Sequence, residues 1–155
     1  MSRKFEIVSK YKEHASTIVM PHRATKYSAC YDIFNNTGED IVIAPGGISD
    51  AISTYIKIKM EPDEVCKFFV RSGHGFKYSV KLVNSTAIID QDYYDNAKNE
   101  GECFVKFHNQ GTKELTIKAG EGMAQAMFQK YLITEDDEAT VGGERIGGLG
   151  STSQK

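Results

Sequence analysis

Short stretches of alternating apolar and polar residues, separated by glycine and proline, run along most of this chain. Residues 54–60, TYIKIKM, alternate apolar side chains with lysines, which is the period of a half-buried β-strand. Residues 64–70, EVCKFFV, predict another strand, which ends directly before Arg71. Further strands are predicted at residues 5–8, 16–20, 40–44, 102–107, 114–117 and 122–128. Because no window shows a long helical period, the pattern predicts an all-β domain, as a sandwich, a barrel or a jelly roll.

Two bends in this pattern predict β-hairpins. Residues 78–89 contain two short strands with Asn84-Ser85 near the bend. The second hairpin joins the strands at 102–107 and 114–117 through Asn109-Gln110-Gly111. Because a hairpin brings its two ends together, we expect the residues that flank the first one to share a pocket.

Those flanking residues carry the candidate chemistry. Arg71-Ser72-Gly73 offers a guanidinium fork, a hydroxyl and a glycine N–H, all suited to phosphate oxygens. Asp90 and Tyr93 place a carboxylate and an aromatic ring three residues apart after an apolar run. A pocket that held both groups would suit the hydrolysis of a phosphate anhydride. We expect His74 to be a polar loop residue, with contact to phosphate as the alternative.

Length and composition narrow the function classes. A chain of 155 residues predicts one domain, and a net charge of −2 with a pI near 6.1 argues against broad binding of nucleic acids or anionic membranes. No apolar run approaches the ~20 residues of a membrane span, and the first residues lack the apolar core of a signal peptide. We therefore expect a soluble, cytoplasmic protein. The three cysteines form no CxxC pair and the histidines lack metal-ligand spacing, so we expect reduced, mostly buried thiols and no zinc site.

Residues 135–155 differ in composition from the rest of the chain. The chain becomes acidic at residues 135–138 and then glycine-rich, which predicts a β-domain at 1–134 and a flexible arm at 135–155. One interpretation of the arm is a frayed terminus. The other is a lid that closes over a polyphosphate with backbone N–H groups, Arg145 and the hydroxyls of Ser151 and Thr152.

Five motifs, in order over residues 28–152, resemble those of the trimeric dUTPases (deoxyuridine triphosphatases), of the phage or bacterial type. They are residues 28–33 (SACYDI), 71–73 (RSG), 84–93 (NSTAIIDQDY), 120–125 (GEGMAQ) and 145–152 (RIGGLGST). The resemblance implies a distorted jelly roll, or β-clip barrel, and a homotrimer with active sites at the subunit interfaces. It also implies hydrolysis of dUTP to dUMP and pyrophosphate with Mg²⁺ as cofactor.

The resemblance also implies roles for individual residues. Asp90 would act as general base on the water that attacks the α-phosphorus, and Asp32 would support Mg²⁺ through water. Main-chain groups from Asn84 to Ile88 would read uracil, and cytosine would leave them unpaired because its polarity is reversed. Tyr93 would pack against the deoxyribose, where a ribose 2′-hydroxyl would clash. The other implied substrate-binding residues are Arg71, Ser72, Gly73, Ala87, Gln125, Arg145, Leu149, Gly150, Ser151 and Thr152.

Some positions depart from the family pattern. Leu149 replaces an aromatic residue that stacks on the base, and such stacking is worth roughly 1–3 kcal/mol elsewhere. Ala87 replaces a common glycine, Gly122 a common arginine, and Arg145 is one residue closer to the following glycines than in many relatives. Residues 95–101, DNAKNEG, resemble an added flexible surface loop and a possible contact site for a regulatory protein.

Two other functions are considered. The first is a deoxycytidine triphosphate deaminase, an enzyme with a fold similar to that of the dUTPases. Its chemistry needs a glutamate near the base, and residues 71–93 contain no glutamate. Release of ammonia from the cytosine nucleotide would identify that enzyme. A noncatalytic nucleotide sensor that binds a protein is the second alternative, which the intact set of Arg71, Ser72, Asp90 and Tyr93 weighs against.

Overall fold

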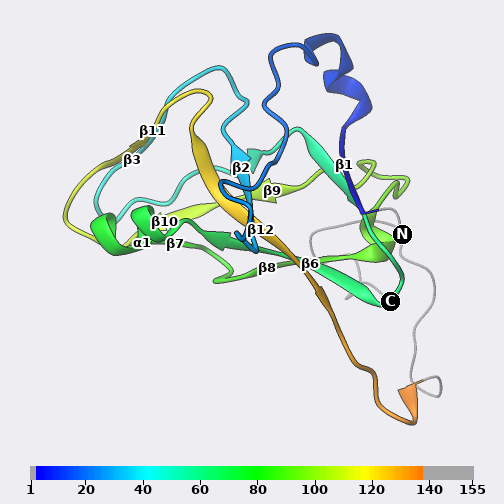
Figure 1. Ribbon diagram of the computed structural model, residues 1–155. Helices are drawn as coiled ribbons and strands as arrows, with labels where there is room; N and C mark the ends of the chain where they lie inside the picture. Colours follow the sequence, from blue (N-terminus) through cyan, green and yellow to red (C-terminus); the bar gives the residue numbers. More distant parts are fainter. Residues whose placement is uncertain (1–2, 138–155) are drawn as a thin grey trace.

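The computed structural model describes residues 3–137 of the chain (Figure 1). Most of its regular structure is β-strand, which confirms the predicted all-β class. The strands are β1 (Lys4–Ile7), β2 (Tyr31–Phe34), β3 (Ile41–Ile43), β4 (Ile52–Ser53), β5 (Ile56–Lys59), β6 (Glu64–Val70), β7 (Val80–Leu82), β8 (Ala87–Asp90), β9 (Phe104–Val105), β10 (Phe107–Asn109), β11 (Leu115–Ile117) and β12 (Gly122–Lys130). The helical segments are α1 (Ser72–Tyr78) and two 3₁₀ turns, η1 (Ser9–His14) and η2 (Gln91–Tyr93). No helix within residues 3–137 is long and apolar enough to cross a bilayer.

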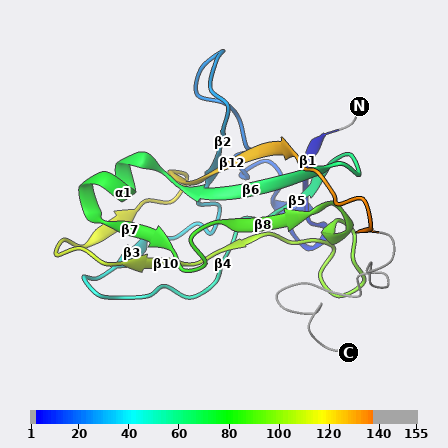
Figure 2. The same cartoon turned by 90° about the horizontal axis from the view of Figure 1, so that it is seen from below.

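A four-stranded antiparallel sheet forms the centre of the fold, in the order β2-β12-β6-β8. The longest strand, β12, pairs with β6 from Ala124 opposite Val70 to Lys130 opposite Glu64. On the other side of β6, the edge strand β8 runs antiparallel, with Ala87 opposite Phe68 (Figure 2). The remaining strands pair two by two, as β1–β5, β3–β11, β4–β9 and β7–β10.

Apolar side chains from these strands meet in one core. Ile33 of β2, Phe68 of β6, Leu82 of β7, Phe107 of β10 and Met123 of β12 are each at most 1% exposed. Burying a side chain of this size contributes roughly 1.5–3 kcal/mol. The core therefore joins the four-stranded sheet to the two-stranded pairs, because these residues come from both.

The two predicted hairpins are wrong as paired ladders. Strand β7 pairs with β10 and β8 pairs with β6, so the strands on either side of the Asn84-Ser85 bend have different partners. Strands β10 and β11 likewise do not pair with each other, because β10 pairs with β7 and β11 pairs with β3. Figure 2 shows that β7 and β8 run in the same direction, so the bend between them does not reverse the chain. Burial decides where β7 pairs, because its Val80 and Leu82 lie in the core at 2% and 1% exposure.

Two other predictions differ from the structure. Residues 16–20 form no strand, because the amide of Asn36 accepts a hydrogen bond from Val19 N at 2.9 Å and donates to Val19 O at 3.3 Å. These bonds replace those that a neighbouring strand would make. Within residues 54–60, the strand begins only after Tyr55, whose φ of +66° interrupts the extended chain. Lys57 of β5 is 9% exposed and pairs with Asp95, so this strand is more deeply covered than predicted.

The helix α1 was not predicted, because its sequence SGHGFKY contains two glycines and glycine disfavours helix. Packing explains it: His74 is 6% exposed, and a Cβ on Gly75 would lie 3.7 Å from the Val70 side chain. The helix ends at Ser79, which has a left-handed φ of +55°.

Of the cysteines, Cys66 and Cys103 are buried, and burial raises the pKa of the Cys66 thiol to about 12. The division into a domain at 1–134 and an arm at 135–155 stays a prediction.

Candidate active site

A hollow of about 100 Å³ lies at the end of β8, and we call it the β8 pocket. It brings together five of the predicted site residues. These are Asn84, Ala87, Ile88, Asp90 and Tyr93; Ile89, Cys103 and Phe104 complete the lining. Because β8 is an edge strand of its sheet, the N–H and C=O groups on its outer side have no strand partner within the described residues. This edge can therefore present main-chain donors and acceptors to a ligand in the pocket.

Asp90 directly precedes the 3₁₀ turn η2, and Tyr93 is the last residue of that turn. Asp90 ends β8, and its backbone is extended, with φ −79° and ψ 157°. One 3₁₀ turn aligns residues three apart, so the turn places both side chains at the same pocket. Asp90 is exposed to water, whereas Tyr93 is 7% exposed and its hydroxyl donates to Glu102 O at 2.7 Å. The arrangement sets a water-accessible carboxylate beside a fixed aromatic ring.

A second hollow, of about 300 Å³, lies beside α1, and we call it the α1 pocket. It is lined by Arg71, Ser72, Gly73, His74, Lys77, Tyr78, Leu115, Thr116, Glu121 and Gln125. Strand β6 ends at Val70, and α1 starts at Ser72 with its first helical hydrogen bond from Gly75 N to Arg71 O at 3.0 Å. Ser72 and Gly73 are exposed there, and a Cβ on Gly73 would meet no heavy atom within 4 Å. The predicted phosphate-binding residues thus face open space.

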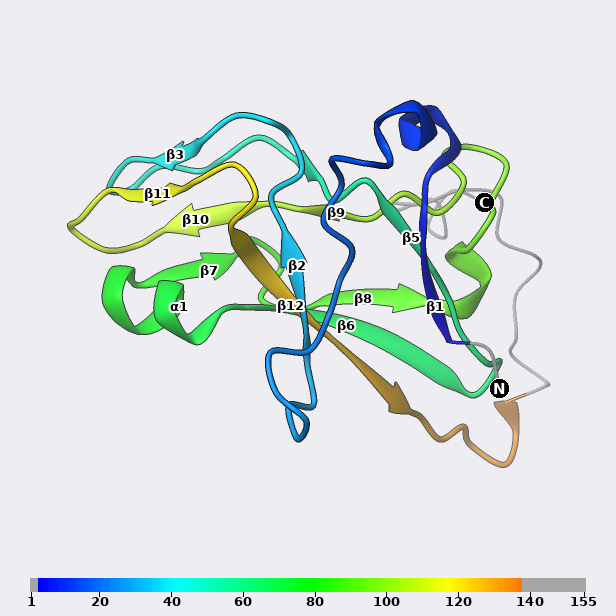
Figure 3. The ribbon, with the colours of Figure 1, turned by 45° about the horizontal axis from the view of Figure 1, so that its top comes forward.

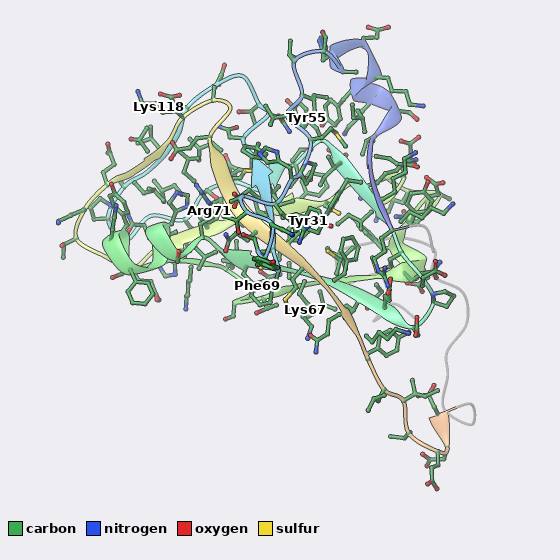
Figure 4. The ribbon with its side chains drawn as sticks, viewed as in Figure 1. Tyr31, Tyr55, Lys67, Phe69, Arg71 and Lys118 are labelled. Atoms are coloured by element: carbon green, nitrogen blue, oxygen red, sulfur yellow. The ribbon has the colours of Figure 1, made fainter. Side chains whose placement is uncertain are left out.

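Arg71 is held at this pocket by β2 and β12 (Figure 4). Its Nη1 donates to Gly122 O at 2.9 Å, and its Nε lies 3.4 Å from Asp32 Oδ1. Gln125, which is opposite Asp32 in the β2–β12 register, donates to the same oxygen at 3.3 Å. Adjacent strands therefore gather Asp32, Arg71 and Gln125, which stand 93 positions apart at the extremes of the sequence.

Gly122 gives Arg71 the space for this position. A Cβ on Gly122 would lie 2.9 Å from Arg71 Nη1 and 3.0 Å from its Cζ. The guanidinium thus occupies the volume that a side chain at position 122 would fill. This contact is a physical reason for the glycine that departs from the expected pattern.

His74 is not the polar loop residue that was expected. It lies within α1, and its Nδ1 has no hydrogen-bond partner among residues 3–137 although the atom is buried. Burial, reinforced by the nearby charge of Arg71, lowers the pKa of His74 below its ordinary 6.5. The ring is therefore neutral near pH 7, and the positive charge of the α1 pocket comes from Arg71 and Lys77.

The two pockets are separate within one chain, so the expectation that the bend brings Arg71 and Asp90 together is wrong. They share no lining residue. Asp90 lies opposite Val65 of β6, and Arg71 follows six residues further along. Six residues at about 3.3 Å each separate the two positions by roughly 20 Å. Figure 3 shows the reason: β8 runs back along β6, away from α1.

Other residues of the two pockets had no sequence signal. Cys103, directly before β9, and Phe104, the first residue of β9, line the β8 pocket, and Thr116 of β11 lines the α1 pocket. Residues 3–137 contain no group of three or more His, Cys, Asp and Glu side chains placed to hold a metal ion. The predicted site residues Arg145, Leu149, Gly150, Ser151 and Thr152 lie outside the described residues.

Comparison with known proteins gives a consistent family. The model of the dUTPase family matches residues 16–152. A deoxyuridine 5'-triphosphate nucleotidohydrolase of Lactococcus lactis is 40% identical over 150 residues, which is 97% of each chain. An enzyme of the same name from Desulfitobacterium hafniense is 34% identical over 137 residues, which is 86% of each chain.

Solved structures give the same result for the fold. A dUTPase from Streptococcus mutans is similar with a TM-score of 0.71 and 32% identity, over 84% of this chain and 98% of that one. A mutant dUTPase from phage phi11 of Staphylococcus aureus, which coordinates a structural Mg(II) ion, has a TM-score of 0.66 at 19% identity. The similarity covers 87% of this chain and 94% of the phage protein. At that identity, the likeness concerns the fold alone.

Proposed function

The chain belongs to the dUTPase family, and on that premise we propose that it hydrolyses dUTP to dUMP and pyrophosphate. The β8 pocket is the observation that carries the proposal. Residues of the edge strand β8, among them Asp90, line it together with Tyr93. Main-chain groups cannot change their polarity, so an edge that pairs with uracil leaves buried groups unsatisfied against cytosine.

The catalytic site is completed by a second copy of the chain. Asp90 must activate water beside the α-phosphorus while Arg71 binds neighbouring phosphate oxygens of the same triphosphate. Asp90 lies opposite Val65, and roughly 20 Å of β6 separates Val65 from Arg71. One chain therefore cannot place both Asp90 and Arg71 at the same triphosphate. A symmetric homotrimer, in which the α1 pocket of one subunit faces the β8 pocket of the next, satisfies this requirement. The proposed trimer also explains why each chain carries two half-sites.

In the proposed mechanism, Asp90 accepts a proton from the attacking water as general base, an effect worth about 10²–10⁴ in rate. Arg71, Ser72, Gly73 and Gln125 bind the phosphate oxygens and hold the triphosphate in line for attack. Asp32 is 8% exposed, and its carboxylate is the kind of hard oxygen that would support Mg²⁺ through water. When bound, Mg²⁺ neutralises the charge that develops on the leaving pyrophosphate.

The glycine-rich arm contributes donors in this proposal. Arg145, Ser151 and Thr152 bind phosphate, Gly150 supplies a main-chain N–H, and Leu149 covers the base. Truncation after Gly143 is expected to lower turnover and to leave the melting temperature of the domain unchanged. A truncated protein with full turnover would remove the arm from the mechanism. The protein partner expected at residues 95–101 stays a prediction.

A pyrophosphate-release assay tests the proposal. Rates are measured with dUTP, dCTP, dTTP, dATP and dGTP, with and without Mg²⁺, and ammonia is measured in parallel for dCTP. We expect pyrophosphate from dUTP alone and a large loss of rate without Mg²⁺. Equal rates for all bases would contradict recognition by β8, and ammonia from dCTP would indicate the deaminase.

A further inference from the structure

The segment 94–101, which includes the flexible added loop indicated by the sequence at residues 95–101, is wrapped around Tyr93 by hydrogen bonds. Asn99 Nδ2 donates to the Tyr93 hydroxyl at 2.8 Å, and that hydroxyl donates onward to Glu102 O at 2.7 Å. Asn96 Nδ2 donates to Tyr93 O at 2.7 Å and to Asn99 Oδ1 at 2.8 Å. Two side-chain amides therefore hold both ends of the tyrosine, its hydroxyl and its carbonyl.

The amide oxygens of the same asparagines shape the loop. Asn96 Oδ1 accepts from Lys98 N at 3.1 Å and from Asn99 N at 3.2 Å. Asn99 Oδ1 accepts from Gly101 N at 3.2 Å. Gly101 has φ +81°, and a Cβ there would lie 2.6 Å from Tyr93 O, so the loop backbone presses against the tyrosine. Each amide thus uses its oxygen to fold the loop, and the NH₂ groups of both reach Tyr93.

The loop is fastened to the body of the protein at its two ends. Asp95 pairs with Lys57 of β5, and Tyr94 donates its hydroxyl to Glu6 of β1 at 2.7 Å. Glu100 accepts from Ser9 N, at the start of η1, at 2.7 Å. The support of Tyr93 is consequently rigid, because it rests on three separate elements.

We propose that Asn99, supported by Asn96, is a positioning residue that fixes the Tyr93 ring against the sugar and so sets the preference for deoxyribose over ribose. The inference rests on the proposed function, because it takes the Tyr93 ring as a wall of the nucleotide pocket. A ring can exclude a 2′-hydroxyl only if it cannot move aside. Its hydroxyl lies behind it, between an amide donor and a carbonyl acceptor, and this pair of bonds stops the ring from swinging away.

The test compares substrates in one protein. The ratio of kcat/KM for dUTP to kcat/KM for UTP is measured in wild type, Asn99→Ala, Tyr93→Phe and the double variant. Asn99→Ala is expected to lower the ratio about tenfold, through loss of the partly buried hydrogen bond to the Tyr93 hydroxyl, mainly by raising the rate with UTP. Lys98→Ala is the matched control, since its side chain is exposed in the same loop, and its ratio should equal that of wild type.

The double variant separates positioning from loop stability. If Asn99 acts through the Tyr93 hydroxyl, Asn99→Ala changes nothing further once that hydroxyl is gone, so the two effects are not additive. Additive effects, or an unchanged ratio in Asn99→Ala, would overturn the inference. If Asn99→Ala does not fold, Tyr93→Phe alone decides, because an unchanged ratio there shows that the hydroxyl anchor has no role. Wild type that fails to hydrolyse dUTP would instead refute the proposed function.

Discussion

Mixed assemblies of two inactive variants test the separation of the half-sites. Asp90→Asn keeps the shape of the carboxylate but removes the general base, and we expect it to bind nucleotide and lose turnover by about 100-fold or more. Arg71→Gln removes the guanidinium from the α1 pocket. Asp90 of β8 lies opposite Val65 of β6, and Arg71 lies six residues, or roughly 20 Å, further along the chain from Val65. In the proposed trimer, each working site therefore takes Asp90 from one subunit and Arg71 from another.

The expected activity follows from counting subunits. When equal amounts of the two variants are unfolded together and reassembled at random, a site needs an Asp90→Asn chain on its Arg71 side, a probability of one half. It also needs an Arg71→Gln chain on its Asp90 side, again one half, so about one quarter of the sites are intact. Pyrophosphate release from dUTP should thus rise from near zero to about one quarter of the wild-type rate.

A second mixture serves as control. Wild type reassembled with the Asp90→Asn, Arg71→Gln double variant should also give about one quarter of the wild-type rate if sites form between chains, and about one half if they form within a chain. Each single variant taken through the same treatment alone should stay inactive. No recovery in the mixture of single variants, together with one half in the control, would refute the argument from β-strand register.

The other predictions concern single residues. Gly122→Ala should fold normally but displace the guanidinium of Arg71, which lies 2.9 Å from the added Cβ, and lower kcat/KM for dUTP roughly tenfold or more; unchanged kinetics would contradict it. Gly101→Ala and Gly38→Ala both place alanine at a similar φ, +81° and +83°, but only position 101 is crowded, with a backbone oxygen at 2.6 Å. Urea unfolding should show a loss of about 1–2 kcal/mol for Gly38→Ala and about 2 kcal/mol more for Gly101→Ala, and equal losses would show that the crowding is relieved. The hydrogen bond from Arg3 lowers the pKa of the Glu64 carboxyl below its ordinary 4.5. The stability that the charged Glu64 contributes is therefore present above that value and is lost as the pH falls through the lower folded pKa. The melting temperature of Glu64→Gln should therefore fall less steeply than that of wild type below about pH 5, and parallel curves would contradict this account.

Strand positions with a regular alternation of apolar residues could be predicted from the sequence. Residues 64–70 form β6 with the predicted bounds, and residues 122–128 lie within β12. Both stretches bury most of their apolar side chains, so local pattern and tertiary burial agree. Where they disagree, as at residues 16–20 and in α1, a distant partner decides: the amide of Asn36 in the first case and the burial of His74 in the second.

The candidate site likewise contains contacts between residues close in the sequence and contacts between residues far apart in it. Asp90 precedes and Tyr93 ends one 3₁₀ turn, so their proximity follows from their spacing. The contact of Asp32 with Arg71 and Gln125 depends on the order of β2, β12 and β6 in the sheet, which no spacing reveals. The role of Asn99 was hidden for a related reason, because a polar, glycine-ended segment has the composition of a free loop until its amides find partners.

By itself, the sequence determined the all-β class, the five motifs and the chemical groups that a nucleotide needs, because these depend on residue type and on short-range periodicity. Only the tertiary structure decided which strands pair, that the guanidinium of Arg71 and the carboxylate of Asp90 stand at opposite ends of β6, and that an asparagine loop holds the tyrosine. The physical reason is that strand pairing and side-chain burial are settled between segments far apart in the chain, where the free energy of the whole core outweighs the preference of any turn.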